Sequence, residues 1–220
     1  MRRIVAISII VISICQASAQ TVRDVWLSMP DSIIPYLTAD NRASMLSVWE
    51  AGDTIGVTNK LQETSYIETV NELYLDTRLS NASLIQMRLL PTTLAPQPVI
   101  GRTDVVAVDT IICVIRTYFS PVAESDVSFY TTNWEKLSGS YISSVVPTQF
   151  VHRPDTMTEE RYAELVSWWK DAMMIKATLS SSEPMLILEG SPFAMTKDEL
   201  KEMESVLMQI YLKWNGEIFN

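Results

Sequence analysis

Two neighbouring segments of the chain alternate between apolar and polar residues, as the strands of a hairpin do. In residues 73–79, Leu and Thr side chains alternate with Tyr, Asp and Arg, and in residues 85–89 Ile, Met and Leu alternate with Gln and Arg. The turn-forming residues 80–83, Ser-Asn-Ala-Ser, separate the two segments. Because successive side chains of a strand point to opposite faces, the pattern predicts a β-hairpin with one buried face.

Five further segments have the composition of strands. Residues 110–119, TIICVIRTYF, are β-branched and almost entirely apolar, which predicts a central strand. Residues 127–132 alternate again and predict the strand that closes the meander. Residues 173–179 and 185–188 predict a second hairpin. The C-terminal YLKWNGEIF predicts a terminal strand or a hairpin about its Asn-Gly. Residues 91–104 and 136–157 read as a surface loop and a connecting region.

Three segments show the apolar spacing of amphipathic helices. The spacing predicts helices over 39–51, 158–170 and 197–209. A hydroxyl residue stands where each needs a cap: these are Thr38, Thr156 with Glu159, and Thr196 with Glu199.

The stretch SMPDSIIPYLTADNR (28–42) combines acids, hydroxyls and an arginine around a small apolar core. Asp31 or Ser32 can cap a helical turn, and Thr38 and Asp40 stand at the next helix start. Helix starts favour side-chain acceptors and negative charge. We therefore interpret this stretch as structural rather than catalytic.

Together these elements predict one α+β domain over residues 20–220. An antiparallel sheet would carry the three helices mainly on one face, because single helices interrupt runs of strands. The two hairpins, YLDTRLS and MIKATLS, stand about one hundred residues apart. A two-lobed fold built from a degenerate repeat is therefore the alternative.

The first 19 residues have the three parts of a secretory signal peptide. Two arginines precede an apolar run over residues 4–15, and Ala17-Ser18-Ala19 offers a cleavage site. The run is too short to span a bilayer. Cleavage before Gln20 is favoured over lipidation at Cys15, because bulky Ile14 precedes that cysteine. We expect a periplasmic or secreted protein.

Removal of the leader makes the chain more acidic. Fifteen basic residues (17 minus 2) and 26 acidic ones give a formal charge of −11. This charge argues against nucleic acid as a partner, and no second apolar run predicts a membrane span. Cys113 is the one cysteine left, so an intramolecular disulfide is not expected.

Few residues offer catalytic chemistry. Cys113 and His152 are the one mature cysteine and the one histidine, and they have no spacing typical of a metal site. Cys113 stands in the most apolar strand, where thiols are usually inert, and no Gly-x-Ser-x-Gly motif or phosphate-binding glycine loop is present. We therefore predict no catalytic residues, no metal and no cofactor.

Six tryptophans suggest a contact surface instead. Trp49 and Trp169 stand on apolar helical stripes and are expected in the core. Trp134, Trp168 and Trp214 stand near element ends or on the opposite helix face, and we select these three as the candidate binding residues.

Five segments resemble a family of uncharacterised exported proteins of Bacteroidales. They are MPDSIIPYLTADNR (29–42), GVTN (56–59), YLDTRLSNASLIQMRLLP (74–91), ICVIRTY (112–118) and FYTTNW (129–134). The resemblance covers the first two thirds of the mature chain well and the rest more loosely. It implies a location in or beyond a Gram-negative envelope, and it brings no known activity or functional residue.

The sequence therefore favours a non-catalytic exported protein that binds an envelope protein or a small ligand. The alternative is a periplasmic hydrolase that acts on glycan or peptide through acidic residues or His152, since paired carboxylates are recognised only in three dimensions.

Overall fold

A computed structural model describes residues 20–171, 173–193 and 195–220. The helices of these residues are α1 (Val22–Ser28), α2 (Ala39–Glu50), the 3₁₀ turn η1 (Pro147–Phe150), α3 (Glu159–Asp171) and α4 (Lys197–Val206). The strands are β1 (Val57–Thr58), β2 (Thr64–Val70), β3 (Tyr74–Ser80), β4 (Ser83–Pro91), β5 (Gln97–Pro98), β6 (Val105–Val106), β7 (Thr110–Tyr118), β8 (Glu124–Thr131), β9 (Met174–Leu179), β10 (Met185–Ser191) and β11 (Ile210–Lys213). The predicted signal peptide lies outside the described residues.

The strands form antiparallel sheets, so the predicted α+β class is confirmed. A six-stranded sheet has the order β1-β2-β3-β4-β7-β8, a three-stranded sheet the order β11-β10-β9, and β5 and β6 pair with each other. The two predicted hairpins are β3–β4 and β9–β10. They belong to sheets of different size and order, so the halves of the chain do not share one topology, as the repeat alternative would require.

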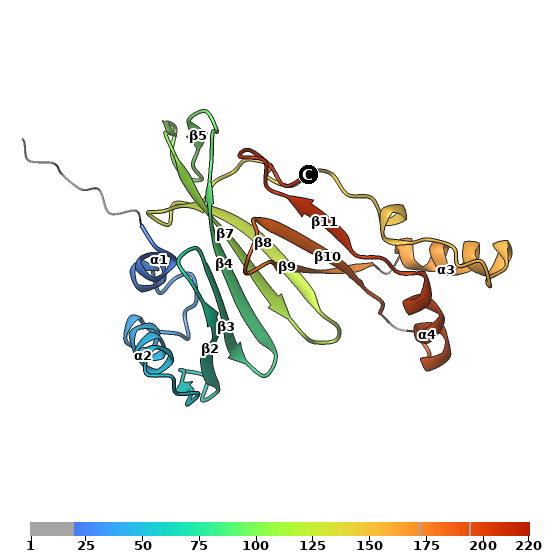
Figure 1. Cartoon of the computed structure of the whole chain (residues 1–220), viewed down its shortest axis with the longest axis horizontal. Helices are drawn as coiled ribbons and strands as arrows, with labels where there is room; N and C mark the ends of the chain where they lie inside the picture. The colour runs from blue at the N-terminus through green and yellow to red at the C-terminus, as the bar shows by residue number, and fades with distance from the viewer. Residues whose placement is uncertain (1–19, 172, 194) are drawn as a thin grey trace, which may run out of the picture.

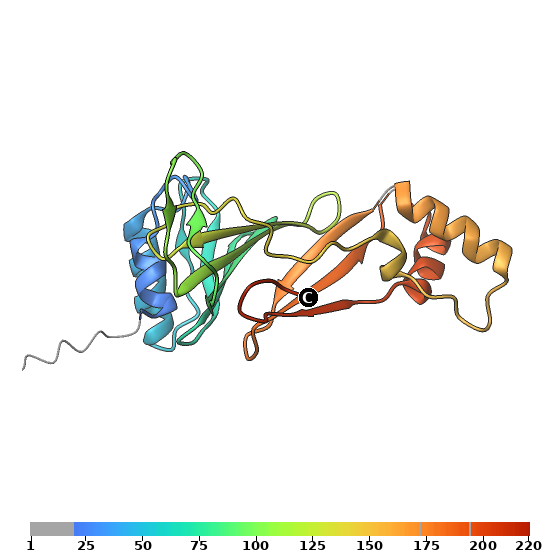
Figure 2. The same cartoon turned by 90° about the horizontal axis from the view of Figure 1, so that it is seen from above.

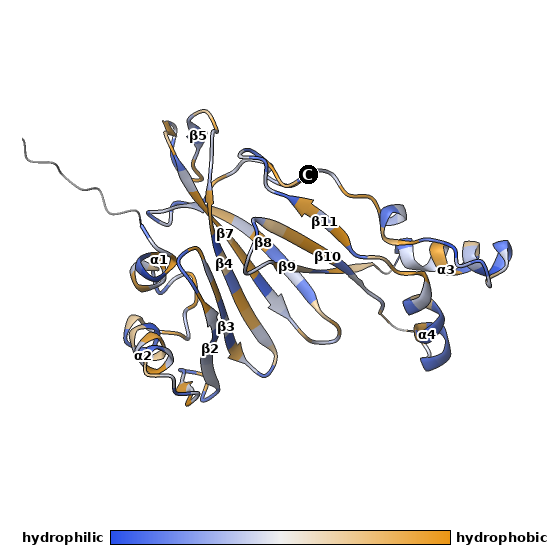
Figure 3. Cartoon of the chain, in the orientation of Figure 1, coloured by the Kyte–Doolittle hydropathy of each residue, from blue (hydrophilic) through white to orange (hydrophobic). Residues whose placement is uncertain are grey.

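Apolar residues gather on both faces of the large sheet. One core contains Leu75, Met87 and Ile112 together with α1 and α2. The other contains Ile111 and Cys113 with residues of the three-stranded sheet. The strands carry much of the apolar sequence, whereas α4 is largely hydrophilic (Figure 3). The predicted central strand, β7, is accordingly buried on both sides.

The helices are divided between the two ends of the molecule, and not placed mainly on one face as expected. Helices α1 and α2 lie against the large sheet, and α3 and α4 lie at the far end of the three-stranded sheet (Figures 1 and 2). The small sheet already covers the second face of the large one. Trp169 of α3 packs so closely on Gly190 of β10 that a Cβ there would lie 2.4 Å from its ring.

One helix was not predicted, and two helix ends differ from the prediction. Helix α1 was not predicted, because its 7 residues are too few to show a period; Thr21 and Asp24 close its capping box. Thr158, rather than Thr156, caps α3 through the N–H of Arg161. Helix α4 ends at Val206, so that Ile210 can enter β11.

The β3–β4 hairpin is buried on its polar face as well as its apolar one. Gln86 and Arg88 are only 5 % and 4 % exposed. The prediction of one buried face is therefore wrong: strand β9 lies across the polar face and removes it from water (Figure 1).

Strand β9 meets the large sheet with its backbone edge. Its outer N–H groups, which face away from β10, donate to side chains of the large sheet: Leu179 to Gln86 Oε1 (3.0 Å) and Ala177 to Ser125 Oγ (2.9 Å). Arg88 donates to the carbonyl of Ser180 at 2.7 Å. A free sheet edge is a site for unwanted strand pairing. Here polar side chains satisfy it and fix the position of the small sheet.

None of the helices in the described residues is long and apolar enough to cross a membrane.

Substitution of Gln86 tests this edge contact. Gln86→Ala should lower the free energy of unfolding by about 2 kcal/mol or more, because it leaves the buried N–H of Leu179 without an acceptor. Urea denaturation measures the change. Gln209→Ala, at an exposed glutamine next to β11 and outside this contact, should change it by less than about 0.5 kcal/mol. Equal effects of the two substitutions would contradict the role of Gln86.

Candidate functional site

A buried arginine shapes the loop between α1 and α2. Arg42 is 1 % exposed, and its guanidinium donates to Asp31 Oδ1 and to the carbonyl of Leu37, both at 2.9 Å, and to the carbonyl of Met29. Asp31 is thus an ion-pair partner rather than a helix cap, while Thr38 does cap α2. The polar groups of this stretch thus have structural roles, and they hold the loop in one fixed form as a wall.

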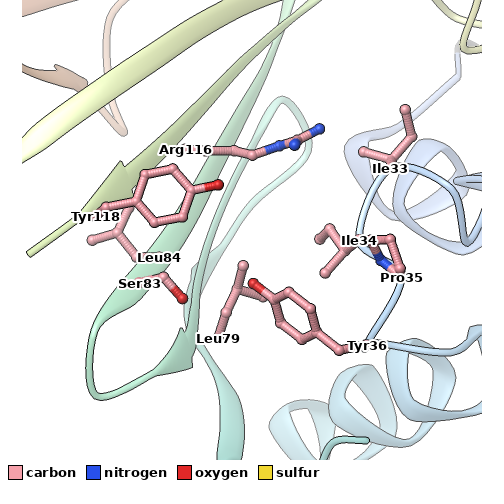
Figure 4. A pocket seen from close by; sticks show the side chains of 9 residues that line it. All are labelled: Ile33, Ile34, Pro35, Tyr36, Leu79, Ser83, Leu84, Arg116 and Tyr118. Atoms are coloured by element: carbon pink, nitrogen blue, oxygen red, sulfur yellow. The ribbon is translucent and has the colours of Figure 1, made fainter. Parts of the chain in front are cut away.

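This wall closes a pocket against the large sheet. The pocket has a volume of about 120 Å³ and lies between the loop, the β3–β4 turn and the end of β7 (Figure 4). Ile34 and Leu79, both 2 % exposed, line it with apolar surface. We call it the Arg116 pocket; it is lined by Ile33, Ile34, Pro35, Tyr36, Leu79, Ser83, Leu84, Arg116 and Tyr118.

Three polar groups surround the opening of the Arg116 pocket. Arg116 lies opposite Ile85 in the pairing of β4 with β7, and therefore projects from the face that carries α1 and α2. The hydroxyls of Tyr36 and Tyr118 point into the space between the loop and the sheet (Figure 4). Within the described ranges, none of these three side chains has an ion-pair or hydrogen-bond partner.

A larger cleft of about 450 Å³ lies beside the ends of β7 and β8. Its cation is already neutralised, because Arg102 pairs with Asp104 and Glu135, each at 2.5 Å. These two carboxylates hold the pKa of Arg102 above its ordinary value. The cleft thus offers a ligand no free cation, whereas the Arg116 pocket offers a guanidinium without a bound acid.

Comparison with known proteins places the chain in a family. The family model described as "Protein of unknown function (DUF3256)" matches residues 14–219. The chain belongs to this family. Its resemblance to a domain-of-unknown-function family is therefore confirmed, and the export of such proteins remains a prediction.

A solved structure supports the fold of this DUF3256 protein. A domain of an uncharacterised protein from Porphyromonas gingivalis W83 superposes with a TM-score of 0.64 at 19 % identity, covering 90 % of this chain and 96 % of that one. At this identity the likeness concerns the fold alone. No curated protein matches the chain.

The three selected tryptophans of the DUF3256 chain do not form one surface. Trp134 is 7 % exposed, so its predicted exposure is wrong: its Nε1–H donates to the carbonyl of Val25 at 3.0 Å, which ties the end of β8 to α1. Trp168 is 37 % exposed on α3, at the opposite end of the molecule. Trp214 is half-buried, packs on Phe219 and donates to the carbonyl of Pro91 at 2.7 Å.

The other candidates for chemistry are also separated. Cys113 is a free, buried thiol whose pKa is raised by burial. His152 is exposed, and its Nδ1 lies 3.3 Å from the carbonyl of Val206. No group of three potential metal ligands is found in the described residues.

The sequence contained little signal for the Arg116 pocket. Arg116 breaks the apolar run of residues 110–119, and a charge within a central strand could have marked it. No sequence pattern links Tyr36 to Arg116, because the loop that carries Tyr36 meets β7 only after the chain folds.

Among the described residues, one carboxyl group whose pKa is raised by burial, that of Asp76, lies on the face of β3 that β9 covers. Asp76 Oδ2 accepts hydrogen bonds from Gln86 Nε2 (3.0 Å) and from the hydroxyl of Tyr74 (3.2 Å). Burial raises the pKa of Asp76 above its ordinary value, and nearby Glu68 raises it further, while the two hydrogen bonds partly oppose them. Since Gln86 also holds the N–H of Leu179, these groups belong to the contact between the sheets.

Replacement of Asp76 tests this environment. An acid with a raised native pKa is destabilising once it ionises, so the wild type should lose stability as the pH rises from about 4, the usual pKa of aspartate, through the native value. Asp76→Asn cannot ionise. Its free energy of unfolding, relative to wild type, should grow between pH 4 and pH 7 in urea titrations. A difference that shrinks over this range would contradict the raised pKa.

Proposed function

We propose that this protein is an exported, non-catalytic binding protein whose partner inserts one apolar side chain into the Arg116 pocket. The observation that carries the proposal is an apolar cavity next to three hydrogen-bond donors that the described part of the chain leaves unused. Binding energy concentrates where a side chain fills a dry pocket ringed by polar contacts.

The size of the cavity favours a protein partner over a cofactor. Sites for drug-sized molecules and cofactors usually have about 300–1,000 Å³. The Arg116 pocket has about 120 Å³. An engineered apolar cavity of roughly 150 Å³ in another protein takes up benzene, so this one suits a single side chain.

The rigidity of the wall supports the same function. A pre-formed pocket does not require ordering of the loop when the partner binds. Arg42 fixes the loop through Asp31 and two backbone carbonyls before any partner arrives.

Cross-linking in living cells tests the proposal. We expect p-benzoylphenylalanine in place of Tyr118, which is 50 % exposed, to cross-link one defined partner. Ile33→Glu, which would place a carboxylate beside Arg116, should abolish that product, since both residues line the pocket.

A matched control keeps this experiment specific. The same amino acid in place of Tyr211, 56 % exposed on β11, should not give the product. A product that persists in Ile33→Glu, or forms equally from position 211, would contradict binding at the Arg116 pocket.

Export is tested by the N-terminus of the protein in cells. The leader motif supports cleavage before Gln20. Mass spectrometry of the protein from the periplasmic and extracellular fractions should find a chain that begins at Gln20. A cytoplasmic chain that retains Met1, or a diacylated Cys15, would contradict this cleavage.

A further inference from the structure

The guanidinium of Arg116 stands out because each other arginine of the described residues has an acid or a backbone carbonyl as partner. Arg88 donates to the carbonyl of Ser180 and Arg153 to that of Met157. Arg23 pairs with Glu50, Arg42 with Asp31 and Arg161 with Glu164 and Glu202. Arg116 forms no ion pair within 4.0 Å in the described residues.

A carboxylate directly across the sheet does not take this role. Asp126 is the register partner of Arg116 on β8, but it is exposed and accepts a hydrogen bond from Ser128 Oγ at 3.0 Å. Asp126 therefore leaves the guanidinium of Arg116 without a bound acid. A ligand with a negative group would complete it.

Carboxylate fits the donors that surround the opening. A guanidinium binds carboxylate through parallel N–H groups. The hydroxyls of Tyr36 and Tyr118 point toward the same space, where they can donate to a ligand oxygen (Figure 4). The site therefore suits an apolar group and a carboxylate held close together.

Only one position in a polypeptide carries both groups on one carbon. In an extended chain, neighbouring side chains point to opposite sides, so an internal apolar residue next to an acid would send the two apart. The last residue carries its side chain and the free carboxylate on the same Cα. Capture of a terminal carboxylate is a known mode of peptide recognition.

We infer that the Arg116 pocket binds the C-terminal residue of its partner, with an apolar side chain in the cavity and the α-carboxylate at the guanidinium of Arg116. This inference rests on the proposed function and names its ligand class.

Three small probes separate the two groups of the ligand. N-acetyl-leucine carries both the side chain and the carboxylate, N-acetyl-leucinamide lacks the charge, and N-acetylglycine lacks the side chain. Backbone NMR titrations of the exported chain, at constant pH and ionic strength, measure their dissociation constants. We expect N-acetyl-leucine to shift resonances of Ile33, Ile34 and Tyr118 with an affinity on the order of millimolar, and each of the other probes to bind at least about ten-fold more weakly.

Variants of the chain show whether Arg116 is the receptor. Arg116→Gln should weaken N-acetyl-leucine at least about ten-fold and leave N-acetyl-leucinamide almost unchanged. Arg153→Gln, at an exposed arginine outside the pocket, should bind both probes like the wild type. Ile33→Glu provides a second variant, because its own carboxylate should compete for Arg116.

The outcomes distinguish this inference from the proposed function. Equal affinity for acid and amide, or an unchanged Arg116→Gln, would overturn recognition of the carboxylate while leaving an apolar anchor in place. Equal binding of N-acetylglycine would reduce the site to an anion site and overturn the inference. Saturation by N-acetyl-leucine with no shift at the pocket would also overturn the inference. So would the absence of binding by every probe at 50-fold the expected dissociation constant. In either case the cross-linking experiment would decide the proposed function separately.

Discussion

The architecture depends on how the outer edge of β9 is satisfied. Backbone N–H groups buried without partners are costly, and those of Ala177 and Leu179 find acceptors only on side chains of the large sheet. This contact brings the second half of the chain onto the first. It also explains why Gln86 and Arg88 can be buried, since each is used to hold β9 or the turn that follows it.

A second constraint operates on the other face of the same sheet. There the guanidinium of Arg42 is buried away from water. Hydrogen bonds to Asp31 and to two backbone carbonyls replace those it would make to water. Trp26 donates in turn to the carbonyl of Arg42 at 3.2 Å, which ties α1 to α2. The loop between these helices has little regular structure of its own, and these bonds give it one fixed form. The Arg116 pocket exists because this loop cannot collapse onto the end of β7.

The two faces of the large sheet therefore differ in how their polar residues are used. The small sheet covers one face. Gln86 and Arg88 of that face form hydrogen bonds with the small sheet. The other carries α1 and α2, which leave the end of β7 partly open and Arg116 without a bound acid. A binding role fits the open face, because polar groups not needed for folding are the ones available to a partner.

The sequence by itself determined the local structure. Period-two alternation located the β3–β4 hairpin, an apolar β-branched run located β7, and the caps at Thr38 and Thr196 located α2 and α4. These signals arise between residues close in the chain. The sequence could not show that the polar face of β3–β4 is buried, that Trp134 is covered by α1, or that Arg116 faces the loop at Tyr36. Each of these depends on contacts between segments distant in the chain, such as β4 with β9. Only the packing of the two sheets and the helices decides which polar side chains hold the fold together and which remain accessible to a ligand.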